Sequence, residues 1–467
     1  MTPIFLGILL YVLLQLLLGY TVSRRIRTED DYLLAGRNLG YVLATFSIFA
    51  TWFGAESCIG TAGAAYAEGI SGVAADPFGY AVCLFLMGLF FAVPLWRMKL
   101  TTIADFFRIR FSASTERVIA VIMIPTSLLW AAAQIRAFGL VLSASSVLEV
   151  STAVTVAATA VIAYTIMGGM LADAMTDIVQ GFILIAGLAL LAVTLIADSG
   201  GIIAALQSVP AERLALSSSG TQGVITSVLR TAETWAIPIL GSVTAQEMVS
   251  RVLASRSPMI ARRSSLMAGG TYLLVGLIPL GVGLLGSSIL PGLDQPEQIL
   301  PMVAQQHFST IGYIVFAGAL VSAILSTVDS ALLAASGIFC HNILIPLQPQ
   351  MEEHTKVRIQ RLGVFVMGLL AYMLAMYAQG VYDLVKEASA FGSGAVFVVF
   401  MFGMYTKFGG ARSATTALVV GCVLWLFAHY VASFEFSFLL ATVCSLAAYS
   451  LFALAERAVP EVSPSDR

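Results

Sequence analysis

The sequence predicts an all-α polytopic membrane protein with about thirteen transmembrane helices. Three observations support this prediction: the composition, the lengths of the apolar stretches and the placement of the basic residues. Of the 467 residues, 59% are hydrophobic and only 11% are charged, and the mean hydropathy is +0.92. A soluble globular domain has about 25% charged residues, so this composition cannot form a surface that faces water. A soluble enzyme, a nucleic-acid-binding protein and a disordered scaffold are therefore excluded.

Thirteen apolar stretches are long enough to cross a bilayer, because a spanning helix needs about 20 largely apolar residues. Their approximate limits are 3–22, 41–66, 75–96, 116–146, 150–167, 173–197, 222–250, 266–291, 306–342, 358–379, 384–406, 412–431 and 435–455. The polar stretches between them have the length of loops, so we expect one transmembrane domain over residues 1–467 and no soluble domain.

The basic residues give an orientation, because cytoplasmic loops are enriched in Lys and Arg. The first span has no basic residue before it and three arginines soon after it, a polarity opposite to that of a cleaved signal peptide. With the N-terminus outside, twenty of the twenty-four basic residues fall on the cytoplasmic side, and Arg136, Arg213, Arg230 and Lys386 are the exceptions. The twenty are Arg24, Arg25, Arg27, Arg37, Arg97, Lys99, Arg108, Arg110, Arg117, Arg251, Arg256, Arg262, Arg263, Lys356, Arg358, Arg361, Lys407, Arg412, Arg457 and Arg467. This predicts an integral protein of the plasma or inner membrane with a cytoplasmic C-terminus.

Ionisable residues inside the spans mark candidate functional sites, because a charge in hydrocarbon is costly. They are Glu56, Arg136, Asp173, Asp177, Arg230, Glu233, Glu247 and Asp329. Asp173, Arg230 and Glu247 are expected near the membrane interfaces, where burial costs little.

The second span combines glycines with a carboxylate. Gly54, Gly60 and Gly63 stand among small residues around Glu56, near the middle of the membrane. Such a helix can unwind and expose backbone carbonyls, and irregular backbone at this depth is tolerated only where it lines a cavity or a site. The alternative is close helix packing through Gly60 and Ala64.

The ninth span contains three hydroxyls and a carboxylate within five residues, Ser326, Thr327, Asp329 and Ser330. Oxygen ligands of this type suit hard cations. On their own the hydroxyls are equally consistent with hydrogen bonds to their own helix. Combined with carbonyls from a broken second span, they suggest a sodium site.

The fourth and sixth spans each carry polar residues with two interpretations. Thr176 and Asp177 lie in the predicted cytoplasmic half of the sixth span, where they line an ion exit path or cap the start of a helix. In the fourth span, Gln134 and Arg136 are too deep to reach the interface easily. Arg136 either pairs with a carboxylate such as Glu56 or receives an anionic group of a substrate.

Cysteines and histidines suggest no metal site. The five cysteines, Cys58, Cys83, Cys340, Cys422 and Cys444, lie inside apolar stretches and are interpreted as small buried hydrophobes. The four histidines, His307, His341, His354 and His429, are scattered over loops and span ends without metal spacing. An enzyme is therefore not expected, and neither is a cofactor other than a coupling ion.

Several motifs in this order resemble the sodium:solute symporter family. They are DYLLAGR at 31–37, ATWFGAE at 50–56, TIADFF at 102–107, YTIMGG at 164–169 with TDIVQ at 176–180, and STVDSALLAAS at 326–336. Within the family, the high-affinity choline transporter branch is nearest in appearance. The similar segments there are ATW at 50–52, PFGY at 77–80, WAAA at 130–133 and ILP at 299–301.

The resemblance implies a five-plus-five inverted repeat formed by the second to sixth and the seventh to eleventh spans, a core of about 41–406. The spans at 3–22, 412–431 and 435–455 would be peripheral. In such folds, substrate and ions bind near the midplane between discontinuous helices.

The resemblance also implies site residues. The family's shared sodium site corresponds to the carbonyls of Ala50, Phe53 and Ala323 and the hydroxyls of Ser326 and Thr327. Asp177 matches an acidic position that the family associates with sodium coupling or release. Trp52, Tyr80 and Trp130 match the aromatic cage of the choline branch, which holds a quaternary ammonium by cation-π attraction.

The chain departs from the choline branch at several positions. Two cage tryptophans of that branch have no counterpart in 243–247 (VTAQE) or 390–394 (AFGSG), and Glu56 and Arg136 add charges. These departures favour a substrate with hydrogen-bonding groups. The expected substrate-binding residues are Trp52, Glu56, Ser57, Tyr80, Trp130, Gln134, Arg136, Thr244 and Gln246, with Asp329 as a further polar residue.

The sequence therefore predicts a symporter that couples sodium flux to the import of a small organic solute by alternating access. The expected partners are sodium, the lipid bilayer and a solute that is amine- or betaine-like, or zwitterionic or carboxylated. A proton-coupled carrier of the same fold, with Glu56, Asp177 or Asp329 as the titrating group, is one alternative. A membrane sensor is a second.

Overall fold

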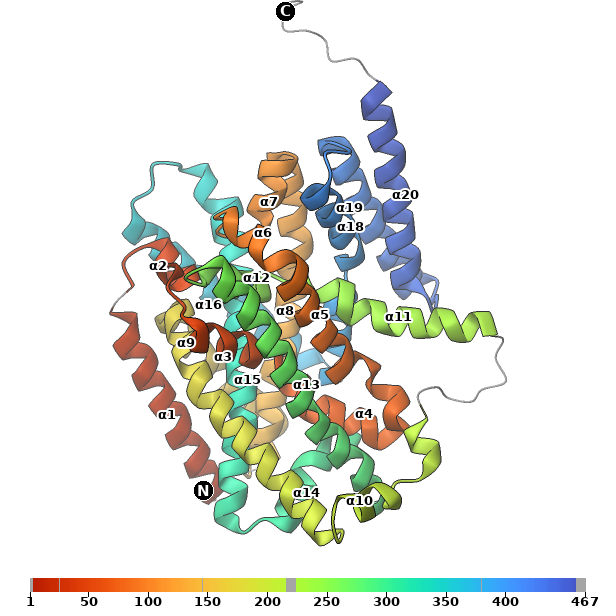
Figure 1. The fold of residues 1–467 in the computed structure, drawn as a ribbon. Coiled ribbons are helices and arrows are strands. Elements are labelled where there is room, and N and C mark those ends of the chain that lie inside the picture. Colours follow the sequence, from red (N-terminus) through yellow and green to blue (C-terminus); the bar gives the residue numbers. More distant parts are fainter. Residues whose placement is uncertain (1–2, 25, 145, 216–223, 379, 459–467) are drawn as a thin grey trace, which may run out of the picture.

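The chain folds into a bundle of helices, which confirms the predicted fold class (Figure 1). The computed structural model describes residues 3–24, 26–144, 146–215, 224–378 and 380–458. Within these ranges no strand forms, and an isolated β-bridge joins Leu39 to Ser255. Nine stretches of the described residues are long and apolar enough to cross a membrane as they stand.

Each predicted span corresponds to one helix, to half of a longer helix or to two consecutive helices. They are α1 (Pro3–Ser23); α3 (Tyr41–Trp52) with α4 (Thr61–Glu68); α5 (Tyr80–Leu86) with α6 (Ala92–Arg97); α8 (Ala113–Ala144); α9 (Val150–Asp198), which contains two spans; α11 (Val224–Ser242) with α12 (Gln246–Ala254); α13 (Pro258–Ile289); α15 (Thr310–Phe339); α16 (Glu353–Tyr377); α17 (Val381–Ala390) with α18 (Ser393–Tyr405); α19 (Ala411–Leu426); and α20 (Ser437–Ala458).

Short helices connect or extend the spans. The α-helical ones are α2 (Glu29–Leu34), α7 (Ile103–Arg110), α10 (Ile202–Ser208) and α14 (Ile299–His307). The π-helical turns are Glu56–Gly60, Ala74–Gly79, Met87–Phe91, Cys340–Leu344 and Phe427–Val431, and the 3-10 turns are Ala35–Arg37, Gly69–Val73, Ala211–Leu214, Pro296–Gln298 and Ile345–Leu347.

The bundle has two ends that correspond to the two sides of a membrane. Figure 1 shows α10, α14 and the beginning of α1 at one end, and α7 and the end of α20 at the other. We call these ends the α14 face and the α7 face.

The helical run α9 is a hairpin of two spans and not one long helix. Tyr164 Oη and Thr176 Oγ1 are 2.8 Å apart, whereas twelve residues of continuous α-helix would separate them by about 18 Å. The chain reverses at Gly169, where φ is 55° and ψ is −175°. The separate spans predicted at 150–167 and 173–197 are therefore both present.

The first span of each predicted repeat is interrupted. After α3 the chain leaves helical geometry at Phe53, where ψ is 70°, and between α11 and α12 it does so at residues 243–245. A third interruption, at Gly392 with φ of 63°, divides α17 from α18. The sequence had indicated only the first of these from its residues alone.

The central helix of the bundle is α15. Every residue from 319 to 338 is buried, and the helix packs against α8, α9 and α16. Helices α1, α16, α19 and α20 expose large apolar side chains, among them Leu17, Leu369, Val423 and Leu451. Such surfaces suit contact with lipid, so the polar residues of α15 must be satisfied inside the protein.

Replacement of Gly169 by alanine should destabilise the α9 hairpin. The backbone there lies in a region that favours glycine, and a Cβ would lie 2.9 Å from the backbone oxygen of Tyr32. We expect Gly169→Ala to cost about 1–3 kcal/mol, measured as a lower midpoint of thermal unfolding in detergent. Gly270→Ala in α13 is the control, because a Cβ there meets nothing within 4 Å. Equal midpoints for the two variants would contradict the conclusion that the α9 hairpin requires glycine at position 169.

Candidate functional site

The candidate site lies at the interruption between α3 and the π-helical turn Glu56–Gly60. A Cβ on Gly54 would lie 2.7 Å from Glu56 Oε2, 2.7 Å from Thr327 Oγ1 and 2.9 Å from Gln134 Oε1. Three polar side chains from three spans therefore converge on the position that a side chain would fill. Only glycine leaves room for this convergence.

The predicted sodium ligands meet between α3 and α15. Thr327 Oγ1 donates to the carbonyl of Ala50 at 3.3 Å and to that of Ala323 at 3.1 Å. Ser326, the next residue of α15, donates to Asp177 Oδ1 of α9. Phe53 is the first residue after α3, and its ψ of 70° turns its carbonyl away from the helical direction. The structure thus joins Thr327 to the carbonyls of Ala50 and Ala323, with Ser326 next to Thr327 on α15 and Phe53 at the end of α3.

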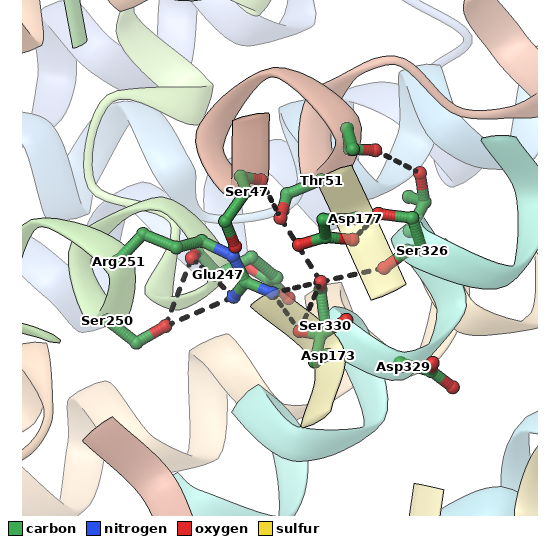
Figure 2. A network of polar contacts seen from close by, with 12 residues as sticks. Ser47, Thr51, Asp173, Asp177, Glu247, Ser250, Arg251, Ser326, Asp329 and Ser330 are labelled. Carbon is green, nitrogen blue, oxygen red and sulfur yellow. Dashed lines mark hydrogen bonds and ion pairs between the residues drawn. The ribbon is translucent and has the colours of Figure 1, made fainter. Parts of the chain in front are cut away.

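A cluster of charged side chains lies beside this junction (Figure 2). Arg251 of α12 donates through Nη2 to Asp173 Oδ2 of α9 and to Ser330 Oγ of α15, and through Nη1 to the carbonyl of Glu247 at 2.9 Å. Thr51 Oγ1 of α3 lies 3.2 Å from Ser330 Oγ. This network, the Arg251 cluster, ties four helices together.

The burial of this cluster corrects the prediction for Arg251. Arg251 was expected in a cytoplasmic loop, but its side chain is 0% exposed. Asp173 and Glu247, which were expected near the membrane interfaces, are both buried inside the protein, and Glu247 accepts a hydrogen bond from Ser127 at 2.6 Å. The reason is that α12 continues the seventh span beyond its interruption and packs inside the bundle. Arg230, which was also expected near an interface, pairs with Glu435 at the surface of the protein.

The cluster contains more negative than positive groups. Asp173, Asp177 and Asp329 are all buried, and each has one carboxylate oxygen without a partner. Among the described residues, Arg251 is the only basic group that forms an ion pair with any of them. Asp329 accepts a hydrogen bond from Thr165 at 2.6 Å. In the described part of the chain, no group of three or more acidic, His or Cys side chains is arranged to hold a metal ion.

The interpretation of Asp177 as a helix cap is not supported. Its carboxylate accepts from Ser326 of another helix, while Thr176 donates back to Ala172 and Asp173 of its own helix. Asp177 therefore faces α15, where it lies beside the predicted sodium ligands.

The predicted aromatic cage is assembled as expected. The rings of Trp52 and Trp130 have centroids 5.5 Å apart, and those of Tyr80 and Trp130 are 6.1 Å apart. Tyr80 Oη lies 2.9 Å from Ser389 Oγ. All three rings are buried, and neither indole N–H has a partner.

Two buried carboxylates lie next to the cage. Gln134 donates to Glu56 Oε2 at 2.6 Å and accepts from the amide of Ala55 at 2.9 Å, so it holds Glu56 against the interruption. Ser57 and Tyr272 both lie within hydrogen-bonding distance of Asp76 Oδ2, at 2.7 and 2.9 Å.

Sequence reasoning missed Asp76 and Tyr272. Asp76 stands at the predicted start of the third span, where a carboxylate suggests an interface. Its position directly before the PFGY motif at 77–80 is the signal that could have found it.

Three predicted residues lie apart from the cage or lack the expected partner. Arg136 donates to the carbonyl of Ala375 at 3.2 Å and forms no ion pair with Glu56. Gln246 accepts from the amide of Ile103 at 2.7 Å, which fixes the start of α7. Thr244 is buried in the interruption between α11 and α12.

A cavity of about 1410 Å³ connects the interruption with the α14 face. Glu56, Tyr80 and Arg136 line it at one end, and the residues 294–298 that lead to α14 line it at the other. A small organic molecule can therefore reach Glu56 and Tyr80 from the α14 face.

Comparison with known proteins agrees with this geometry. Residues 32–421 match the model of the sodium:solute symporter family. The chain belongs to this family.

Individual relatives are distant. The chain is 27% identical over 383 residues to the high-affinity choline transporter 1 of Caenorhabditis elegans, which covers 76% of this chain and 63% of that protein, less than two thirds of its length. It is 22% identical over 409 residues to the sodium/pantothenate symporter of Escherichia coli, with 85% and 83% covered. A solved Na+-coupled sialic acid symporter in a substrate-bound outward-open state has a TM-score of 0.84 at 19% identity, with 97% of both chains covered. These relatives and the many apolar helices identify an integral membrane protein with a transporter fold.

Loss of Arg251 should destabilise the protein more than loss of a surface charge pair. Removing one partner of a buried ion pair costs about 3–5 kcal/mol, because the remaining charge is left uncompensated. We expect Arg251→Met to lower the thermal midpoint strongly, and the double variant Arg251→Met/Asp173→Asn to recover part of the loss. Arg230→Met, which breaks the exposed pair with Glu435, should have almost no effect. Similar midpoints for Arg251→Met and Arg230→Met would contradict the assigned role of the cluster.

Proposed function

We propose that the protein is a sodium-coupled symporter that imports a small organic solute by alternating access. The observation that supports this best is the junction of α3 and α15, where Thr327 reaches the carbonyl of Ala50 in α3 and also bonds back to the carbonyl of Ala323 in its own helix. Carbonyl and hydroxyl oxygens are the ligands that hard cations require. The proposed sodium ligands are Ala50, Phe53, Ala323, Ser326 and Thr327, with Asp177 on the path to or from them.

Sodium and solute would be coupled through the interruption itself. Glu56 Oε2 and Thr327 Oγ1 approach the same point beside Gly54, so a cation held by Thr327 would lie close to a carboxylate of the solute site. Its charge would favour the ionised form of Glu56 and hold α3 against α15. A ligand shifts a conformational equilibrium only by binding one state more tightly, and this contact between two spans provides such a difference.

The structure corresponds to one state of the proposed cycle. The cavity is open toward the α14 face, and the Arg251 cluster closes the bundle beside the sodium ligands. If the N-terminus is outside, as the basic residues predict, this state faces outward. Passage of the solute to the other side would require α12 to separate from α9 and α15.

A proton-coupled carrier is the second candidate, and the unpaired oxygens of Glu56, Asp177 and Asp329 favour it. Uptake into vesicles driven by a pH gradient in potassium medium would support this candidate. Uptake that requires a sodium gradient would support the first.

Loss of the Thr327 hydroxyl should weaken sodium binding. Because one ligand oxygen and the link to Ala50 are removed, we expect Thr327→Ala to raise the sodium concentration of half-maximal thermal stabilisation by at least about tenfold, with potassium as the reference ion. Thr159→Ala is the matched control, since this exposed threonine makes the same hydrogen bond to the carbonyl four residues earlier. An unchanged sodium midpoint in Thr327→Ala would refute the ligand assignment.

A further inference from the structure

Four polar atoms beside the aromatic cage have no hydrogen-bond partner. Two are acceptors, Glu56 Oε1 and Asp76 Oδ1, and two are donors, Trp52 Nε1 and Trp130 Nε1. The four residues are at most 4% exposed. Buried polar groups in proteins are nearly always paired, so four unpaired atoms around one cage indicate the groups of an absent ligand.

The two carboxylates belong to one site. Ser57, which directly follows Glu56 in the chain, lies 2.7 Å from Asp76 Oδ2, so the segment that carries Glu56 is bonded directly to Asp76. Both are nearly inaccessible, at 1% and 0% exposure. The cost of two neighbouring buried carboxylates is high unless a cation joins them.

The described chain supplies no such cation. Neither Glu56 nor Asp76 forms an ion pair with a basic side chain of the described residues. Arg136, the nearest candidate predicted from the sequence, is directed to the carbonyl of Ala375. A cation that joins Glu56 and Asp76 would therefore be a bound one and not a side chain of the described residues.

We propose that the transported solute is a small amine whose protonated nitrogen carries N–H donors and is held between Glu56 and Asp76. This inference rests on the proposed transport function and names its substrate class. The faces of Trp52, Tyr80 and Trp130 attract the cation, and an acceptor group at the other end of the solute receives the indole N–H groups.

The carboxylates distinguish this class from quaternary ammonium ions. An aromatic cage alone accepts a methylated ammonium, the type of solute named for the nematode relative. A quaternary nitrogen has no N–H, so Glu56 Oε1 and Asp76 Oδ1 would remain unpaired after binding. A site built for hydrogen bonds rejects ligands that lack the donor, because its buried polar groups are left unsatisfied.

The test compares primary amines with their fully methylated counterparts, which have the same charge. The purified protein is titrated with ethanolamine, butylamine and benzylamine, with the N,N,N-trimethyl form of each, and with glycine betaine and butyrate. The readout is thermal stabilisation in sodium or potassium phosphate, which contain no amine. We expect a primary amine to bind, and its trimethyl counterpart to bind at least about tenfold more weakly. Trimethyl forms that bind as tightly, preferential binding of betaine or butyrate, or no binding by any compound would overturn the proposal.

Variants test whether Glu56 and Asp76 cause the preference for primary amines over their trimethyl forms. Glu56→Gln and Asp76→Asn should each weaken the best amine by at least about tenfold and reduce the preference over its trimethyl form. Glu68→Gln, an exposed carboxylate in the wall of the same cavity, should change neither. The melting midpoint without ligand reports folding of each variant. If Glu56→Gln and Asp76→Asn fold and keep the full preference, the carboxylates do not recognise the amine and the proposal fails.

The ion dependence separates this proposal from the transport proposal. An amine that binds equally in sodium and potassium would leave the substrate class intact and contradict sodium coupling. Stabilisation by sodium alone, with binding of acids and not amines, would leave sodium coupling intact and contradict the substrate class.

Discussion

The arrangement of the whole site depends on one backbone position, Gly54, where the second span is interrupted. Because no side chain occupies this position, Glu56, Gln134 and Thr327 can approach one another from three different spans. If the second span were a continuous helix here, its backbone would separate these three groups. The interruption therefore creates both the junction with α15, where we propose that sodium binds, and the end of the cavity, where we propose that the solute binds.

The charge balance on the two sides of the interruption follows one pattern. Asp173, Asp177 and Asp329 lie in or beside the Arg251 cluster and have one guanidinium among them, and the cage has two carboxylates without a basic partner among the described residues. Both regions contain more carboxylates than basic side chains, in a part of the protein where unpaired charge is costly. A bound sodium ion and a bound amine would each supply it. Their binding would then be mutually favourable, because either cation would favour the ionised form of Glu56 and hold α3 in the arrangement that binds the other.

The sequence predicted the features that depend on residues close together in the chain. Apolar length gave the spans, the glycines around Glu56 indicated the interruption, and the closely spaced hydroxyls indicated the polar face of α15. Arg251 and Asp76 were misplaced or missed because their burial depends on distant segments. Arg251 is buried only because α12 continues inward after a second interruption, and Asp76 only because α13 places Tyr272 beside it.

The central claim is that sodium and solute are coupled through the carboxylate beside Gly54. The most direct measurement is equilibrium binding of radioactive sodium to the purified protein, with and without a saturating concentration of the best amine. Linkage requires the amine to tighten sodium binding by the same factor by which sodium tightens amine binding. The account predicts a factor of at least about five in the unmodified protein, the lower end of ordinary coupling, and a factor near one in Glu56→Gln. Sodium binding that does not respond to the amine, or that responds equally in Glu56→Gln, would contradict it.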